Sequence, residues 1–159
     1  MSTTPFVYRG CELPDGLLYA IDRDVWVRLD DDGAATLGMM DTAQTQCGKV
    51  VHVRFKAVGR RVERWQSAAT IESAKWVGPF PTPLSGEIVA TNEATFASDI
   101  LVANKDPYGR GWLVRVRPTD LGTERSGLLA GEEARRTYAT RIDERGINCI
   151  RCAEEGESA

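Results

Sequence analysis

The sequence predicts a mainly β domain, made of many short strands with a few small helices. Two features lead to this expectation. Short runs in which apolar and polar residues alternate recur along the chain, which is typical of strands with one buried face. These runs are separated by glycine and proline, of which the 159 residues include 15 and 7. Both residue types mark turns and interrupt longer elements, so short strands are expected throughout.

The chain is predicted to begin irregularly and then to form a pair of strands. Residues 1–16 contain prolines and glycines without a periodic pattern. The apolar segment 25–29 is a predicted strand. The Asp-Asp-Asp-Gly sequence at 30–33 favours a turn, from which residues 34–37 can return as the partner strand.

A short helix and an alternating strand are expected next. Asp41 is a candidate N-cap for a helix over 42–47, and Gly48 would end it. Residues 50–55 alternate as a strand does. The two faces would carry Val51, Val53 and Phe55 on one side, and Val50, His52 and Arg54 on the other.

The C-terminal half is predicted to hold further strands and the longest helix. The elements expected there are a strand over 67–71, an extended connection through Pro79, Pro81 and Pro83, a turn and strand over 84–89, a helical turn over 93–98 capped by Asn92, a turn at 106–109, a strand over 112–117 ended by Pro118, and a helix over 132–142. Acidic residues early in that helix and basic residues late suit the helix dipole, and Gly146 would end it.

Composition and charge exclude several classes of function. The net charge is -3 and the basic residues are scattered, so no nucleic-acid footprint is visible. No apolar run is long enough to span a membrane, and the N-terminus lacks the pattern of a signal peptide, so we expect a cytoplasmic protein. The four cysteines are then expected to be free thiols. A single histidine, His52, argues against a histidine-rich metal site or a hydrolase triad, and no catalytic role is assigned to it.

Lys75 is the leading candidate for a functional residue. It lies in residues 70–78, where alternation up to the lysine and apolar residues just after it predict two short strands with Lys75 near the hairpin tip. Gly59 lies sixteen positions before it and Gly86 eleven positions after it. A lysine in such a turn resembles the attachment site of a lipoyl or biotinyl carrier. The alternative is a solvated surface lysine without a function.

Several motifs together resemble the H protein of the glycine cleavage system. They are Val25-Trp26-Val27-Arg28, Thr36-Leu37-Gly38-Met39 with Asp41 and Ala43-Gln44, Glu72-Ser73-Ala74-Lys75, Pro83-Leu84-Ser85-Gly86-Glu87, and the run from Asn104 to Leu113. The similarity covers residues 17–131, which sets apart an N-terminal extension (1–16) and a C-terminal helix with a cysteine-containing tail (132–159). It implies a flattened β-barrel of two sheets, a barrel-sandwich hybrid, with peripheral helices.

The resemblance also implies a function. Lipoate would be joined by an amide to Lys75, which then anchors a swinging arm, and Glu72 would aid recognition by the lipoylating enzyme. The protein would be a carrier and not an enzyme. Its partners would be a lipoate-protein ligase or lipoyl synthase and a dihydrolipoamide dehydrogenase. Trp76 would pack over the arm, or alternatively serve as a cross-strand core aromatic. Glu72 has its own alternative, a solvated strand carboxylate.

Departures from glycine cleavage H proteins point to a subgroup. Val25 stands where those proteins have an acidic residue, so it cannot hold a cationic aminomethyl cargo. The segment 76–80 is apolar and aromatic where they have small residues and a Ser-Asp pair. The chain is most similar to the H-like lipoate-binding proteins of sulfur oxidation, which are linked to a heterodisulfide-reductase-like complex. That resemblance implies a sulfur-containing cargo. The alternatives are a glycine cleavage H protein and an unmodified H-like interaction module.

The Cys149-x-x-Cys152 pair admits three interpretations. It could be a redox pair that resolves a disulfide with the arm, half of a zinc site, or two incidental thiols in a tail. Cys11 and Cys47 do not supply standard zinc-ligand spacing, and no second Cys-x-x-Cys completes a site. No metal site is therefore predicted.

Overall fold

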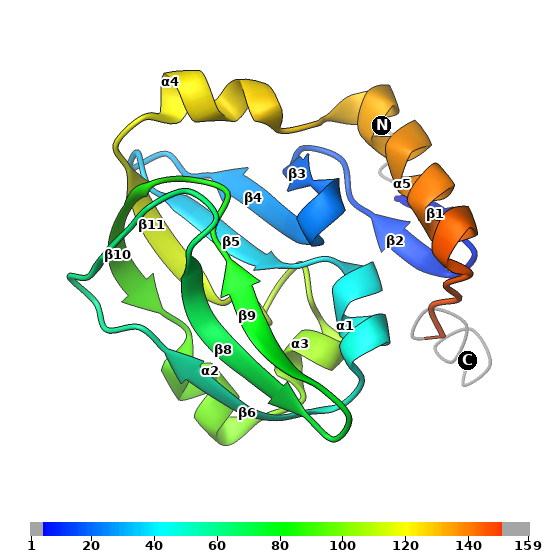
Figure 1. Cartoon of the computed structure of the whole chain (residues 1–159), viewed down its shortest axis with the longest axis horizontal. Helices are drawn as coiled ribbons and strands as arrows, with labels where there is room; N and C mark the ends of the chain where they lie inside the picture. The colour runs from blue at the N-terminus through cyan, green and yellow to red at the C-terminus, as the bar shows by residue number, and fades with distance from the viewer. Residues whose placement is uncertain (1–4, 151–159) are drawn as a thin grey trace.

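The computed structural model describes residues 5–150. Two β-sheets face each other across a core (Figure 1). One has six strands in the order β3-β4-β5-β11-β10-β7, and the other has three in the order β6-β8-β9. The strands of the larger sheet are β3 (Leu18–Ala20), β4 (Val25–Leu29), β5 (Ala35–Met39), β7 (Arg61–Val62), β10 (Gly86–Thr91) and β11 (Val114–Pro118), and those of the smaller sheet are β6 (Val50–Phe55), β8 (Ser67–Ser73) and β9 (Val77–Pro81).

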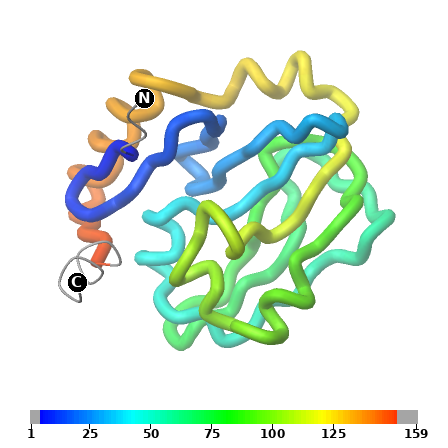
Figure 2. Tube along the Cα trace, turned by 180° about the vertical axis from the view of Figure 1, so that it is seen from behind, coloured from blue at the N-terminus to red at the C-terminus, as the bar shows by residue number. Residues whose placement is uncertain are grey.

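Short helices lie around the two sheets. They are η1 (Ile21–Arg23), α1 (Asp41–Cys47), α2 (Glu93–Ser98), α3 (Val102–Lys105), α4 (Leu121–Glu124), η2 (Arg125–Gly127) and α5 (Gly131–Arg145). From behind, the segment that holds α2 and α3 crosses in front of the sheets, while α5 lies to one side (Figure 2). The predicted mainly β fold with two sheets, peripheral helices and a C-terminal helix is confirmed. No helix in residues 5–150 is long and apolar enough to cross a membrane.

The main core lies between the sheets and follows the alternation of the strands. Val27 and Leu37 of the larger sheet pack in the same cluster as Ile71 and Phe80 of the smaller one, and all four are at most 2% exposed. Successive side chains of a strand point to opposite faces, so every second residue reaches this core. The turn between β4 and β5 forms as predicted, with Gly33 in a positive-φ conformation that a side chain would strain.

The predicted faces of β6 are correct for residues 52–55 but wrong for Val50 and Val51, because a β-bulge interrupts the pairing of β6 with β8. The register shifts between Val50 and His52, which leaves Val51 without a partner. The bulge inserts one residue, so Val50 and Val53 both point into the core and Val51 is 52% exposed. Alternation alone cannot reveal a bulge, since the extra residue changes the face of every residue on one side of it.

Two predicted caps also differ. Asp41 is the first residue of α1 and Met40 is the N-cap, although Gly48 ends the helix as expected. Asn92 does occupy the N-cap position of α2, but its side chain makes no capping hydrogen bond. Its Nδ2 atom instead donates to the carbonyl oxygens of Arg110 and Trp112, at 2.7 and 2.8 Å.

The described part of the N-terminal extension, residues 5–16, is ordered, contrary to the prediction of an irregular segment. It forms an antiparallel hairpin of β1 (Phe6–Tyr8) and β2 (Cys11–Leu13), which lies against α5 in both views (Figures 1 and 2). Cys11 is joined to Cys149 by a disulfide, so the expectation of free thiols is wrong for this pair. Cys47 is free and buried, and Cys152 lies outside the described residues.

A second core explains why the extension folds. Residues of β2, of α5 and of the face of β4 turned away from the main core bury one another there, with Trp26 and Tyr138 both 0% exposed. The Trp26 indole donates to the Pro107 carbonyl at 2.9 Å, and Tyr138 donates to the Glu12 carbonyl at 3.0 Å. The extension and the C-terminal helix thus complete one another, although the sequence places them at opposite ends of the chain.

Candidate functional site

Lys75 lies at the exposed tip of the β8–β9 hairpin, as the sequence predicted. Ser73 closes the turn. Its backbone nitrogen donates to the Trp76 carbonyl at 2.7 Å, and its hydroxyl oxygen accepts from the Lys75 nitrogen at 3.3 Å. These bonds satisfy backbone groups that the tight turn would otherwise leave unpaired. The Ser in the Glu-Ser-Ala-Lys sequence therefore holds the backbone that presents the lysine.

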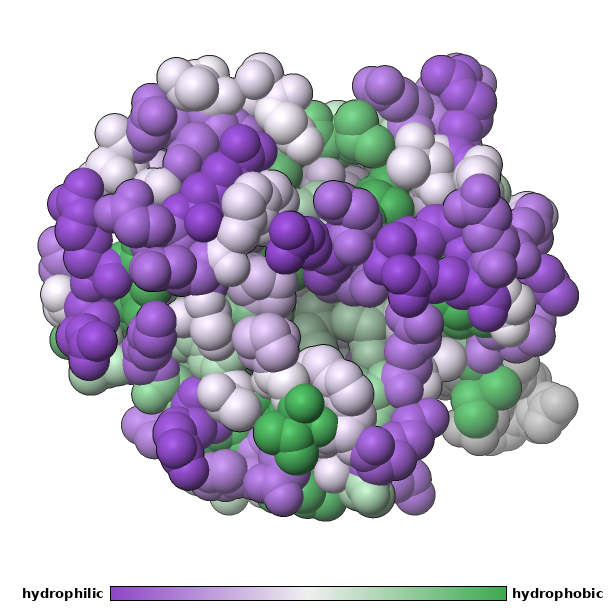
Figure 3. Space-filling view, in the orientation of Figure 1, coloured by the Kyte–Doolittle hydropathy of each residue, from purple (hydrophilic) through white to green (hydrophobic). Residues whose placement is uncertain are grey.

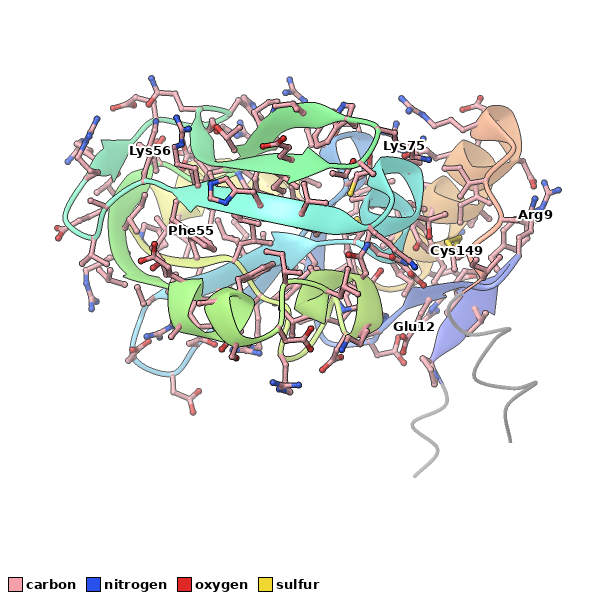
Figure 4. The ribbon with its side chains drawn as sticks, turned by 90° about the horizontal axis from the view of Figure 1, so that it is seen from below. Arg9, Glu12, Phe55, Lys56, Lys75 and Cys149 are labelled. Atoms are coloured by element: carbon pink, nitrogen blue, oxygen red, sulfur yellow. A yellow bond between two sulfur atoms is a disulfide. The ribbon has the colours of Figure 1, made fainter. Side chains whose placement is uncertain are left out.

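The Lys75 side chain lies across Gly48, at the end of α1 (Figure 4). A Cβ atom on Gly48 would be 3.1 Å from Cε of Lys75, and the φ of +80° at this glycine also disfavours a side chain. Asn104 fixes this segment, because its Nδ2 donates to the Gly48 carbonyl at 2.8 Å and its Oδ1 accepts from the Val50 nitrogen at 3.0 Å. Asn104 opens the motif run 104–113 of the sequence, so part of that motif positions the neighbourhood of Lys75.

Trp76 lies beside the lysine and is 41% exposed. Its ring covers Gly78, where an added Cβ would be 2.1 Å from Cζ2 of the indole. The glycine therefore leaves the space that the ring occupies. Trp76 is not a core aromatic, so that alternative is wrong. Its packing over an attached arm stays a prediction.

A cleft of about 460 Å³ begins at Trp76 and runs between the β8–β9 hairpin on one side and η1, α1 and the end of α5 on the other. Figure 3 shows a hollow near the centre of this face, with apolar surface at its floor and hydrophilic residues around it. The apolar part of its lining is Met39, Ala43, Ile71, Trp76, Pro79, Phe80 and Pro81, and the polar part is Asp22, Arg23, Asp24, Gln46, Cys47 and Arg145.

Two carboxylates line the cleft, and the less exposed of them, Asp24, is already engaged. It accepts from the Thr42 hydroxyl at 2.8 Å and from Nη2 of Arg141 at 3.1 Å. Both side chains of the Asp24–Arg141 ion pair are less than a fifth exposed. Val25, which the sequence comparison singled out, is 1% exposed in the main core and does not line the cleft. Whether a carboxylate is available to a cationic cargo therefore depends on Asp24, the residue before Val25, and not on Val25 itself.

Cys47 is the free thiol of the cleft. Burial raises its pKa, and the positive charge of Lys75 opposes that rise. A raised pKa keeps the group protonated near neutral pH, where it is a poor nucleophile. Cys47 therefore contributes an inert wall in the unmodified protein.

The remaining candidates lie elsewhere. Glu72 is exposed on β8, between His52 of β6 and Val77 of β9 in the sheet register, so it faces outward on the hairpin that carries Lys75. Cys149 is buried in its disulfide with Cys11, which the redox and zinc interpretations did not include. No group of three or more potential metal ligands occurs within residues 5–150.

Comparison with known proteins decides the family. The model of the family described as "Glycine cleavage H-protein" matches residues 17–141. The chain belongs to the glycine cleavage H-protein family. It is 42% identical over 152 residues to "Glycine cleavage system H protein 3" of Aquifex aeolicus, covering 94% of both chains. It is 39% identical to "Probable glycine cleavage system H protein 2" of Sulfolobus acidocaldarius, covering 91% of this chain and 97% of that one.

A solved structure gives the same result. The chain is similar to a glycine cleavage system H protein from Mycobacterium marinum, with a TM-score of 0.68 and 30% identity, over 85% of this chain and all of that one. Proteins of this family are carriers and not catalysts, and they bear lipoate covalently on a lysine, so lipoate is the cofactor of this H protein. An exposed lysine beside an apolar cleft fits an acyl chain that ends in a dithiolane.

Sequence reasoning found Lys75 and Trp76 but missed the opposite wall of the cleft. Arg23 and Arg145 lie far apart in the sequence and reach the cleft only because η1 and α5 pack together. Cys47 had a weak signal, since it immediately precedes the glycine that ends α1. The arginines carried no local signal at all.

Proposed function

We propose that this H protein carries lipoate in amide linkage on Lys75 and shuttles sulfur-containing intermediates in cytoplasmic sulfur oxidation, in exchange with a heterodisulfide-reductase-like complex. One observation carries the cargo assignment. The cleft beside Lys75 is apolar at its floor, and its inner carboxylate, Asp24, is already paired with Arg141. A cationic aminomethyl group would find no free inner carboxylate there, whereas a sulfur group needs none.

The residues of this chain supply position, and the lipoyl group supplies two thiols that exchange with disulfides. Lys75 would lose its charge on acylation. Trp76 and the apolar floor of the cleft would contact the alkyl chain, since burying apolar surface away from water is favourable. Tethering also raises the effective concentration of cargo at each partner.

The pattern of relatives supports a role apart from glycine cleavage. Those in Aquifex aeolicus are numbered 2, 3 and 5, so that organism holds several H proteins. H protein 3 aligns over 94% of this chain, whereas the unnumbered H protein of Psychrobacter sp. aligns over 76%. The numbered relative therefore shares more of the chain beyond the common domain. Several copies leave room for carriers with different cargo.

The second candidate is a glycine cleavage H protein that carries the aminomethyl group. It is favoured by the names of the relatives from Aquifex aeolicus, Sulfolobus acidocaldarius and Psychrobacter sp., which mention glycine cleavage. An unmodified interaction module is a third candidate, and the intact Glu-Ser-Ala-Lys sequence at Lys75 argues against it.

Partners follow from the proposed chemistry. A lipoate-protein ligase or lipoyl synthase would modify Lys75, with the exposed Glu72 three residues earlier as a recognition element. A dihydrolipoamide dehydrogenase is a further candidate, because it would reoxidise the dithiol. Replacing Glu72 by Gln should slow lipoylation at least several-fold without changing the melting temperature, whereas unchanged ligase kinetics would make Glu72 a solvated strand residue.

The attachment is tested by expressing the protein with a lipoate ligase and lipoate, and by measuring intact mass and peptide masses. A lipoyl mass is expected on the Lys75 peptide and absent from Lys75→Arg. Lys56→Arg is the matched control, because Lys56 lies at the other end of the sheet (Figure 4). Unmodified Lys75 with several ligases would refute the carrier and favour the interaction module.

The cargo is tested with the lipoylated protein, glycine decarboxylase and aminomethyltransferase. We expect aminomethyl loading at least tenfold slower than for a glycine cleavage H protein measured in parallel. Equal loading would refute the sulfur assignment and establish the second candidate. The lipoylated Mycobacterium marinum protein is a suitable reference, because it has the same fold and a related sequence.

A further inference from the structure

Two guanidinium groups line the cleft without an ion-pair partner in the described part of the chain. They belong to Arg23, at the end of η1, and to Arg145, at the end of α5. Neither forms a salt bridge with a described residue. Other arginines of α5 do pair, since Arg135 binds Asp15 and Arg141 binds Asp24. Within α5, the arginine without a salt bridge to a described residue, Arg145, is therefore the one that lines the cleft.

Arg23 is held in place although no carboxylate of residues 5–150 forms an ion pair with it. Its guanidinium carbon lies 4.8 Å from the centre of the Trp65 ring, within the range of a cation–π contact. A stacked guanidinium keeps its edge donors available, so the ring fixes the group without using its hydrogen bonds. Arg145 is exposed at the last turn of α5, where its position follows from the packing of that helix against η1.

The charges that line the cleft favour an anion. Asp24 is neutralised by Arg141, which leaves Asp22 as the other carboxylate of the lining. Arg23 and Arg145 outnumber it by two to one. Lys75 would add a positive charge only while it is unmodified, because an amide is neutral. In the loaded carrier, the excess positive charge of the cleft therefore comes from the two arginines.

We infer that Arg23 and Arg145 form an anion-selective end of this cleft, which receives a negatively charged group on the lipoyl-bound cargo, of the S-sulfonate class, and disfavours an ammonium group. This inference rests on the proposed function, since it names the chemical class of the cargo. Arginine matches the oxygen geometry of such groups with paired donors, and the partly enclosed cleft strengthens the attraction relative to open water.

The test uses sulfite as the probe on lipoylated, oxidised protein. Sulfite attacks one sulfur of the dithiolane, the new S–S bond forms from its lone pair, and the ring S–S bond breaks to leave the other sulfur as a thiolate. No external oxidant or reductant is needed. Intact mass measured against sulfite concentration gives the equilibrium constant for the adduct. We expect the double variant Arg23→Gln with Arg145→Gln to lower this equilibrium constant about tenfold, roughly threefold for each charge removed.

Two matched variants sharpen this experiment. Arg60→Gln removes an exposed arginine that does not line the cleft, and it should leave the equilibrium constant unchanged. Asp22→Asn removes the opposing carboxylate and should raise the equilibrium constant. The difference between wild type and the double variant should also shrink at high salt, because screening weakens exposed charges. If the double variant has the same equilibrium constant as Arg60→Gln, the anion-selective end is refuted, while the proposed function as a lipoyl carrier is unaffected.

A second measurement works without lipoate. It uses the Lys75→Gln variant, which mimics the neutral amide. Quenching of Trp76 fluorescence by iodide is compared with quenching by caesium. The additional substitution Trp76→Phe shows how much of the total fluorescence comes from Trp76. Iodide should be the better quencher, and Arg23→Gln with Arg145→Gln should reduce the iodide-to-caesium ratio at least twofold. An unchanged ratio would overturn the inference. Absence of lipoate on Lys75 would instead overturn the proposed function, and the ratio would still decide the charge preference of the cleft.

Discussion

The disulfide between Cys11 and Cys149 makes a quantitative prediction about stability. The two residues are 138 positions apart, so the bond closes nearly the whole chain into one loop. In the chain-entropy account, a loop of this length restricts the unfolded state by about 5 kcal/mol. Measured losses for native disulfides are about 2–5 kcal/mol. For a chain of this size each kcal/mol shifts the melting temperature by about 2–4 °C. Cys11→Ala with Cys149→Ala should therefore lower it by roughly 4–20 °C.

The assay is thermal unfolding by circular dichroism, with thiol counting in denaturant alongside it. Wild-type protein should show two thiols before reduction and four after it, because the sequence contains four cysteines. Alanine is the better replacement here, because both positions are buried and a hydroxyl would add a desolvation cost. Cys152→Ala is the control and should have the same melting temperature as the wild type.

Two results would refute this reasoning. One is a double variant that melts within about 1 °C of the wild type. The other is a peptide map in which Cys149 is joined to Cys152 in place of Cys11. The second result would restore the redox interpretation of the Cys-x-x-Cys pair, and it would leave the β1–β2 hairpin held only by the second core and its hydrogen bonds.

Three further predictions concern individual side chains. Lys75→Gln removes the charge that opposes the raised pKa of Cys47, so the pH profile of Cys47 alkylation should move to higher pH; an unmoved profile would mean that the two groups do not interact. Gly78→Ala should displace the exposed Trp76 ring, giving a red-shifted fluorescence and a melting temperature within about 2 °C of wild type, whereas unchanged fluorescence would contradict the packing described. Glu124→Ala should cost about 1.5–3 kcal/mol in urea unfolding, because this buried carboxylate accepts two hydrogen bonds at the turn before β10; a loss below about 0.5 kcal/mol would show that water replaces it.

The pattern of the sequence predicted most of the small elements and the position of Lys75. An apolar run predicted β4, alternation predicted β6 and β8, and the glycine at position 146 ended α5 as expected. These features are local, since a strand's periodicity and a helix stop are decided by neighbouring residues. The bulge in β6 was missed because it depends on how one strand pairs with another.

The sequence by itself determined that this chain is a short-stranded β domain with a lysine presented at a hairpin tip, because those properties reside in contiguous residues. Only the tertiary structure decided what surrounds that lysine. Asp24 is paired with Arg141, and Arg145 reaches the same cleft as Arg23, because the second core holds α5 against η1. Contacts between residues more than a hundred positions apart depend on the packing of whole elements, which leaves no periodic trace in the sequence.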